Sequence, residues 1–268
     1  MTGPHLRSPG AGVAGLIQEN MVAYFRLFAG LPGITVVDDD VFWLVSARGE
    51  PGNYVLRARL AGDTERRIDE VLGQVGRHTD RVDWMVFPGC RPADLGARLA
   101  ARGMQGGPGG IWMLANLPAH PGSPAAPEGF RVEPVRTLAQ LDAWRRVSAA
   151  GFGADVQIHA EAYARHGFGP AANSLHFTGY LRGEPVTSGT LLLAGGIAGI
   201  WDVSTPPPFR GQGFGGALTL ALLREAHARG YRRAWVWSSH MGRRVYERAS
   251  FVAVDAGVRE YPWHRRDV

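Results

Sequence analysis

A proline-rich seam near the middle of the chain limits the folds open to it more than any other feature. Four prolines fall within the ten residues from Pro118 to Pro127. Proline lacks a backbone N–H and fixes φ, so such a run cannot continue a helix or a central strand. We therefore predict two modules, residues 1–117 and 129–268, joined by a linker at 118–128.

The apolar periodicity predicts a mixed α/β fold in the second module. It indicates a strand, two helices, three strands, a helix, a strand, a helix and a strand. Glycine turns at 182–184 and 194–196 would make the three strands a central antiparallel meander, and a βαβ crossover would follow. The predicted ranges are 130–135, 138–150, 157–165, 175–182, 185–193, 197–204, 213–229, 234–238, 243–249 and 252–260. The first module shows a similar but degraded order.

The charged residues and the single cysteine exclude several classes of function. All 29 basic residues are arginine, so mechanisms that need a lysine, such as the P-loop, protein kinase and pyridoxal sites, are excluded. The lone Cys90 excludes internal disulfides and cysteine-rich zinc sites, and the histidine spacing predicts no metal. The net charge of +5 arises entirely after residue 117. That excess is too small to indicate nucleic acid, but it suits a compact polyanionic small molecule.

Nothing in the sequence predicts a membrane segment or a secretion signal. No apolar run reaches about 18 residues. The first 25 residues lack a basic start followed by an apolar block. We therefore expect a cytoplasmic protein.

The most informative motif is a glycine-rich turn after the third strand of the meander. The segment 203–216 runs from a strand end through three prolines and Arg210 into four glycines that open a helix. Unpaired N–H groups at a helix start attract phosphate, and glycine lets an anion approach them. Gly211, Gly213 and Gly216 also fit the dinucleotide fingerprint G-x-G-x-x-G. However, prolines separate strand and turn, and no acid ends the next strand, as that fingerprint requires.

Two motifs in this region resemble those of the GNAT superfamily of N-acyltransferases. The run Arg210–Gly215 is similar to the family's acyl-CoA signature, Arg/Gln-x-x-Gly-x-Gly/Ala. The run Val245–Phe251 is similar to its Leu-Tyr-x-x-x-Gly-Phe segment, with Ser250 in place of glycine. The detailed match covers about residues 197–252. Residues 92–104 resemble part of the degenerate N-terminal module of two-module members.

The resemblance implies a site for acetyl-CoA or another acyl-CoA between two splayed parallel strands. Backbone groups of Val203 and Ser204 would bind the pantetheine amides, with Ser238 or Ser239 contributing from the neighbouring strand. Arg210 would add positive charge near the phosphates. The pyrophosphate would lie on the turn formed by Gly211, Gln212, Gly213, Phe214, Gly215 and Gly216.

The resemblance also implies catalytic roles. Tyr246 aligns with the family tyrosine that protonates the leaving thiolate; the alternative is a tyrosine that only packs the core. Asp202 is flanked by apolar residues on the predicted strand 197–204. It is the first candidate for the general base, although it could instead orient the substrate. Asp155, His159 and Glu161 lie where the family builds its acceptor lid.

Together these features predict a two-module GNAT-like enzyme that transfers an acyl group, most often acetyl, directly to a small-molecule amine. We expect no metal, no nucleic-acid or membrane partner, and a monomer or homodimer. Two alternatives stay open: a CoA-binding protein without catalysis, and an aminoacyl-tRNA-dependent transferase, which the neutral first half disfavours.

Overall fold

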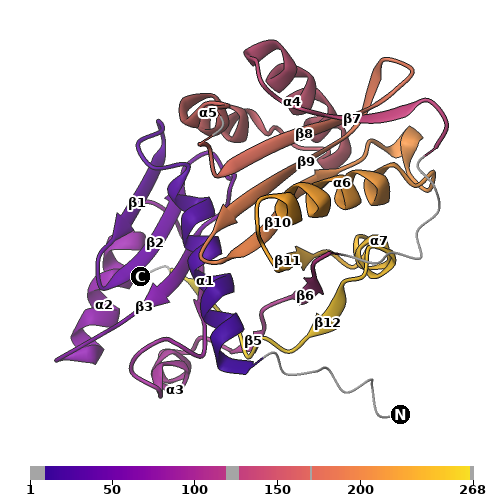
Figure 1. Cartoon of the computed structure of the whole chain (residues 1–268). Coiled ribbons are helices and arrows are strands. Elements are labelled where there is room, and N and C mark those ends of the chain that lie inside the picture. Colours follow the sequence, from indigo (N-terminus) through magenta and orange to yellow (C-terminus); the bar gives the residue numbers. More distant parts are fainter. Residues whose placement is uncertain (1–9, 119–126, 170, 266–268) are drawn as a thin grey trace. The chain divides into compact units, whose positions relative to one another are not determined.

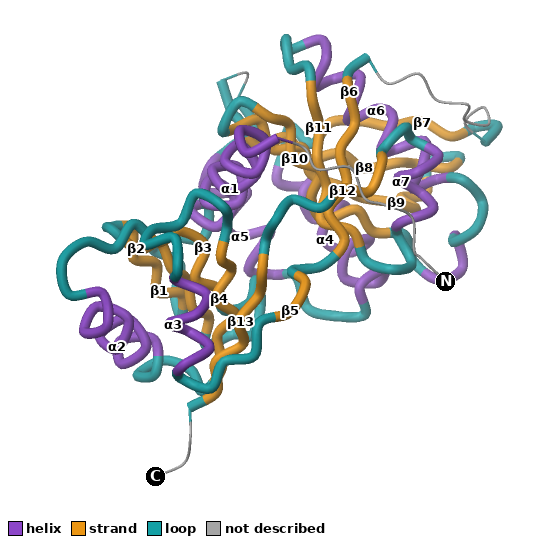
Figure 2. Tube along the Cα trace, turned by 90° about the horizontal axis from the view of Figure 1, so that it is seen from below, coloured by secondary structure: helices purple, strands orange, loops and turns teal. Residues whose placement is uncertain are grey.

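The computed structural model of the protein describes residues 10–118, 127–169 and 171–265. Its chain forms two compact units, each with its own sheet (Figures 1 and 2). Among the described residues, the first unit combines the chain up to Gly109 with the chain from Asp255 onward. The second unit spans Gly110–Val254. The fold class is mixed α/β, as predicted.

The first unit contains a six-stranded sheet in the order β1-β2-β3-β4-β13-β5. Its one parallel pair is β3 with β4, and α2 connects these two strands. Its elements are α1 (Gly10–Arg26), β1 (Ile34–Asp38), β2 (Val41–Ser46), β3 (Tyr54–Ala58), α2 (Thr64–Val75), β4 (Arg81–Val86), α3 (Leu95–Ala101), β5 (Gly107–Pro108) and β13 (Arg259–His264).

The second unit contains a seven-stranded sheet in the order β12-β6-β11-β10-β9-β8-β7. Here too there is one parallel pair, β10 with β11, and the connecting helix is α6. Its elements are β6 (Ile111–Asn116), β7 (Phe130–Pro134), α4 (Leu138–Phe152), α5 (Gln157–His166), β8 (Ser174–Leu181), β9 (Glu184–Ala194), β10 (Ile197–Ser204), the 3-10 turn η1 (Pro207–Phe209), α6 (Phe214–Ala228), β11 (Arg233–Ser238), α7 (Arg243–Arg248) and β12 (Val252–Val254). The meander and crossover therefore form as predicted.

The bounds of the compact units differ from the predicted modules 1–117, 118–128 and 129–268. Strand β6 precedes the seam but pairs with β11 in the second sheet, along Ile111–Asn116. Strand β13 comes from the end of the chain but pairs with β4 in the first sheet. Each half of the sequence thus supplies one strand to the sheet of the other half. The seam itself, from 119 to 126, lies outside the described residues.

The predicted final strand at 252–260 is wrong as a single element. Strand β12 ends at Val254 and β13 begins at Arg259. The Asp255 carboxylate accepts the N–H of Gly257 at 2.9 Å, and Gly257 has φ +68°. This side-chain-capped turn breaks the strand, and the chain then enters the other sheet.

Both predicted hairpin turns of the meander are confirmed. Arg182 and Gly183 have φ of +50° and +92°, and Gly195 and Gly196 have φ of +62° and +75°. Two consecutive residues with positive φ give a turn whose twist matches that of the flanking strands. The turns therefore set the register in which β8, β9 and β10 pair.

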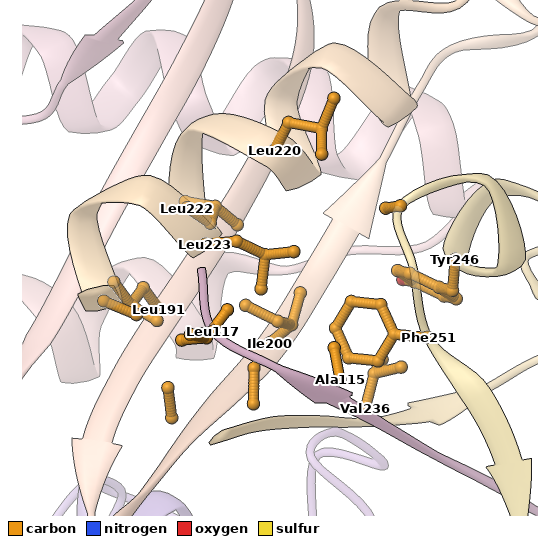
Figure 3. Packing of buried hydrophobic residues seen from close by; sticks show 14 of the residues in the cluster. Ala115, Leu117, Leu191, Ile200, Leu220, Leu222, Leu223, Val236, Tyr246 and Phe251 are labelled. Carbon is orange, nitrogen blue, oxygen red and sulfur yellow. The ribbon is translucent and has the colours of Figure 1, made fainter. Parts of the chain in front are cut away.

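One face of the second sheet packs on α6 and forms the main core of this unit. The inward residues Leu218, Leu222 and Leu223 are essentially fully buried, as predicted, and they contact the strand residues Leu191 and Ile200 in one cluster. Figure 3 shows this cluster, with Tyr246 and Phe251 at the edge nearest α7. Burial of these side chains, at roughly 1.5–3 kcal/mol each, holds α6 on the crossover.

Helix α4 also packs on this sheet. Thr137 caps its N-terminus by accepting the N–H of Gln140, and Gly153 ends it in the left-handed conformation. The indole N–H of Trp144 donates to the carbonyl oxygen of Gly189 at 3.2 Å. Helix α5 packs against α4 and carries Tyr163, which is fully buried.

Candidate active site

The parallel strands β10 and β11 pair over only part of their length. Their ladder joins Ala198–Ile200 to Ala234–Val236, whereas β10 continues to Ser204 and β11 to Ser238. Beyond Ile200 the two strands share no register pair, so their backbones separate at this end. This is the splay that the family resemblance implied, and it places Asp202, Val203 and Ser204 on the strand that borders it.

Asp202 lies in a β-bulge at the start of the splay. Strand β10 pairs with β9 at Trp201 and again at Ser204, so one extra residue interrupts the ladder. Asp202 adopts φ +52°, a left-handed conformation that few non-glycine residues accept. Bulges turn a side chain out of its regular alternation. The hydroxyl of Tyr163, on α5, donates a hydrogen bond to Oδ2 of Asp202.

Tyr246 lies on α7, close enough to Asp202 to sense its charge. Its ring is buried and contacts Phe251 edge-to-face at 5.7 Å. Burial, and to a lesser degree the negative charge of Asp202, raise the pKa of Tyr246 well above its ordinary value. The phenol therefore stays protonated at neutral pH. Within the described part of the chain, no hydrogen bond engages its hydroxyl.

The glycine turn opens α6 with backbone N–H groups that have no acceptor. Gly213 is the N-cap of α6 with φ +89°, and no side chain caps the helix. Among the described residues, no acceptor binds the amides from Gly211 to Gly216; the first intrahelical bond is from Ala217 to the carbonyl oxygen of Gly213. A Cβ added at Gly211, Gly213 or Gly216 would meet nothing within 4 Å. The turn therefore presents unpaired donors to open space, as an anion site requires.

The corresponding helix of the first unit lacks this property. Helix α2 connects the parallel pair β3 and β4, as α6 connects β10 and β11. Its N-cap is Asp63, whose carboxylate accepts the N–H of Arg66 at 3.1 Å. A fixed negative charge thus occupies the place where an anion would bind. The glycine turn of the second unit is the better candidate for a phosphate.

Arg210 is part of the turn, but its guanidinium binds protein carbonyls. Nε donates to the carbonyl oxygen of Thr205 at 2.9 Å, and Nη2 donates to that of Gly151 at 2.7 Å. Gln212 likewise donates to the carbonyl oxygen of Pro208 at 3.0 Å. These side chains tie the turn to its own start and to the end of α4. The predicted role of Arg210 near the phosphates stays a prediction.

The hydroxyls of the predicted strand residues are also engaged within the protein. Ser204 donates to the carbonyl oxygen of Ser148 at 3.2 Å. Ser239 accepts the N–H of Gly242 at 3.1 Å, and Ser238 donates to the carbonyl oxygen of Ser239 at 2.8 Å. Ser239 therefore shapes the turn into α7, which sets the position of Tyr246. The predicted contact of pantetheine with the backbone of Val203 and Ser204 stays a prediction.

The three predicted lid residues lie on or next to α5, the helix whose Tyr163 donates a hydrogen bond to Asp202. The Asp155 carboxylate accepts the N–H of Gln157 at 2.8 Å, and Glu161 accepts the side chain of Gln157 at 3.2 Å. His159 is buried, with its ring 6.3 Å from that of Tyr163. Sequence reasoning missed Tyr163. Its one signal was its place on the predicted helix 157–165.

The two statements that follow concern residues 10–118, 127–169 and 171–265, which the structure describes. No group of three or more histidine, cysteine or acidic side chains is arranged to hold a metal ion. No helix is long and apolar enough to span a membrane.

Comparison with known proteins places the family match on this region. Residues 139–251 match the profile of the acetyltransferase (GNAT) family. The match begins in α4 and ends at Phe251, so it includes the bulge, the glycine turn and Tyr246. Comparison with curated proteins found no match.

Solved structures match nearly the whole chain. A GCN5-related N-acetyltransferase from Kribbella flavida is 15% identical, with a TM-score of 0.65 and 97% of each chain covered. A tandem GNAT protein from the clavulanic acid biosynthesis pathway is 14% identical, with a TM-score of 0.60 and 98% of each chain covered. At these identities the similarity establishes the fold, and it extends over both units. Residues 139–251 of the second unit thus match the acetyltransferase (GNAT) family, and the chain has the fold of these solved GNAT structures.

Proposed function

We propose that the protein transfers an acyl group, most often acetyl, from acyl-CoA to an amine of a small molecule. The observation that carries this proposal is the row of backbone N–H groups from Gly211 to Gly216, which donate to no acceptor among the described residues. It lies on the crossover whose strands separate beside Asp202. One crossover and the helix after it thus combine three features. These are a helix start suited to phosphate, a separated strand pair, and the titratable side chains of Asp202 and Tyr246.

The turn fits a pyrophosphate in both shape and charge. The amides of Gln212 to Gly216 would donate to its oxygens, and the positive end of the α6 dipole would favour its charge. The pantetheine arm would run along the separated part of β10. There it would take the place of the missing β11 neighbour and bond the backbone at Val203 and Ser204.

Asp202 and Tyr246 supply the two proton transfers that aminolysis of a thioester needs. The acceptor amine must lose a proton before or as it attacks the thioester carbonyl, and we assign that proton to the Asp202 carboxylate. The departing CoA thiolate must gain a proton. Tyr246, kept protonated by burial and by the charge of Asp202, is the donor.

The acceptor that fits best is a small amine, in a monomeric or homodimeric cytoplasmic enzyme. The excess positive charge is only +5, and the sequence before residue 118 is neutral. Neither indicates the broad basic surface that a tRNA substrate needs. An acidic residue at the proposed reaction centre suits an acceptor that arrives as an ammonium ion.

Thiol release from acetyl-CoA across a panel of amines tests this function. The panel should contain polyamines, amino sugars, amino acids and arylamines, with the acylated product identified by mass spectrometry. We expect at least one small amine to give product in step with free CoA. Acetyl-CoA binding without turnover on any amine would instead support a non-catalytic CoA-binding protein. Turnover that requires a charged tRNA would support the aminoacyl-tRNA alternative.

A further inference from the structure

The side chain of Asp202 is held by a residue from a different element of the second unit. Tyr163 lies on α5, 39 positions earlier in the sequence, and its hydroxyl donates to Oδ2 of Asp202. The ring of Tyr163 is fully buried. Asp202 itself sits in a bulge with positive φ. The Asp202 carboxylate, which the bulge turns out of the regular strand alternation, thus accepts a hydrogen bond from Tyr163 on α5.

Tyr163 has little freedom to move away from this position. Its ring stacks on the imidazole of His176 at 3.8 Å between centroids and meets the indole of Trp144 edge-to-face at 5.2 Å. Both neighbours are buried. Aromatic contacts of this kind fix the plane of a ring and therefore the direction of its hydroxyl.

His176 is in turn fixed and uncharged. Its Nε2 is 3.0 Å from Oγ of Ser174, and its Nδ1 is 3.0 Å from Oγ1 of Thr190. Burial lowers the pKa of His176 to about 3. The imidazole that stacks on Tyr163 is therefore neutral near neutral pH. It carries no positive charge that would attract the Asp202 carboxylate.

We propose that Tyr163 is a positioning residue, which holds the Asp202 carboxylate in one orientation for accepting the proton of the acceptor amine. This inference rests on the proposed function, because it assumes that Asp202 is the base. The hydroxyl of Tyr163 is directed at the carboxylate, so it is not the group that protonates the thiolate. That role stays with Tyr246, which approaches Asp202 from α7.

The variant Tyr163→Phe removes one oxygen and keeps the ring that stacks on His176. We expect kcat to fall about tenfold while KM for acetyl-CoA stays unchanged, since loss of orientation affects the proton transfer and not the glycine turn.

A matched control and a double variant separate positioning from stability. Tyr231→Phe removes the same atom from a tyrosine just beyond the C-terminus of α6 and should leave both kcat and KM unchanged. In an Asp202→Asn background, Tyr163→Phe should lower kcat no further, because the group on which it acts is gone. Melting temperatures show whether each variant remains folded.

Failure of the positioning role can be distinguished from failure of the proposed function. If the wild-type protein turns over an amine but Tyr163→Phe keeps its kcat, the positioning role is wrong and the proposed function stands. If Tyr163→Phe and Asp202→Asn lower kcat by independent factors, Tyr163 does not act through Asp202. If the wild-type protein turns over no amine, the proposed function fails, and the inference fails with it before any variant is made.

Discussion

The Nη2 atom of Arg210 donates a 2.7 Å hydrogen bond to the carbonyl oxygen of Gly151, 59 residues earlier in the chain. With the bond from Nε to the carbonyl oxygen of Thr205, this fastens the glycine turn to the end of α4. The arginine of the acyl-CoA signature thus holds the turn in place within the protein, whatever it adds to the charge at the phosphates.

Loss of the Arg210 side chain should therefore lower the free energy of unfolding even without ligand. We expect Arg210→Ala to lower the melting temperature of the ligand-free protein by roughly 2–4 °C, which corresponds to about 1 kcal/mol. Acetyl-CoA binding should also weaken. Arg224→Ala, which removes an exposed arginine on α6, serves as the control. An unchanged melting temperature, with weaker and less salt-dependent binding, would instead make Arg210 a phosphate ligand.

The close approach of α4 to the end of β10 requires glycine at position 151. A Cβ there would lie 1.8 Å from Oγ of Ser204 and 3.0 Å from the amide nitrogen of Thr205. We expect Gly151→Ala to cost about 2 kcal/mol and to lower the melting temperature by roughly 4–8 °C. Gly216→Ala meets nothing within 4 Å and should keep or raise stability. Equal melting temperatures for both variants would show that this contact is not tight in solution.

The glycine turn and Tyr246 could be predicted from sequence because both are local patterns. The turn needs only a strand end, prolines, glycines and an amphipathic helix in order, and all of these occur between 203 and 229. The hairpins of the meander are local in the same way. Each of these elements forms within a few residues of its predicted bounds.

The contacts that sequence reasoning missed join residues far apart in the chain. Nothing in the pattern of β6 or β13 says which sheet will accept its hydrogen bonds, so the exchange of these strands was not predicted. The same holds for Tyr163, whose role appears only when α5 packs beside the bulge. A short turn at Asp255 and Gly257 was enough to send the end of the chain to the other sheet.

Tyr246 provides a direct test of the chemistry. We expect Tyr246→Phe to lower kcat by roughly 10²-fold, because the leaving thiolate loses its proton donor. The affinity for acetyl-CoA, measured by calorimetry, should change little, since the variant leaves the backbone amides of the glycine turn in place. An unaltered kcat would remove Tyr246 from the reaction and leave it as a core residue.

Neutral, buried His176 should make stability depend on pH. Burial lowers the pKa of His176 from 6.5 to about 3. Between these two pH values the imidazole is therefore protonated in the unfolded chain and neutral in the folded protein. Stability contributed by the neutral form is complete above pH 6.5 and is lost as pH falls toward 3. Relative to His176→Gln, the wild-type protein should lose about 1.4 kcal/mol more per pH unit within this range. Parallel unfolding curves for the two proteins between pH 6 and 4 would contradict this.

Calorimetry of acetyl-CoA binding shows whether acyl-CoA binds through the amides at the start of α6. Gly213 and Gly230 lie at opposite ends of α6, both with φ +89° and both with open space around a new Cβ. Glutamate at either position therefore strains the backbone equally. We expect one acetyl-CoA per chain, unchanged affinity in Gly230→Glu, and an affinity loss of at least about 100-fold in Gly213→Glu from like-charge repulsion. Equal affinities in the two variants, or two acetyl-CoA molecules per chain, would contradict it.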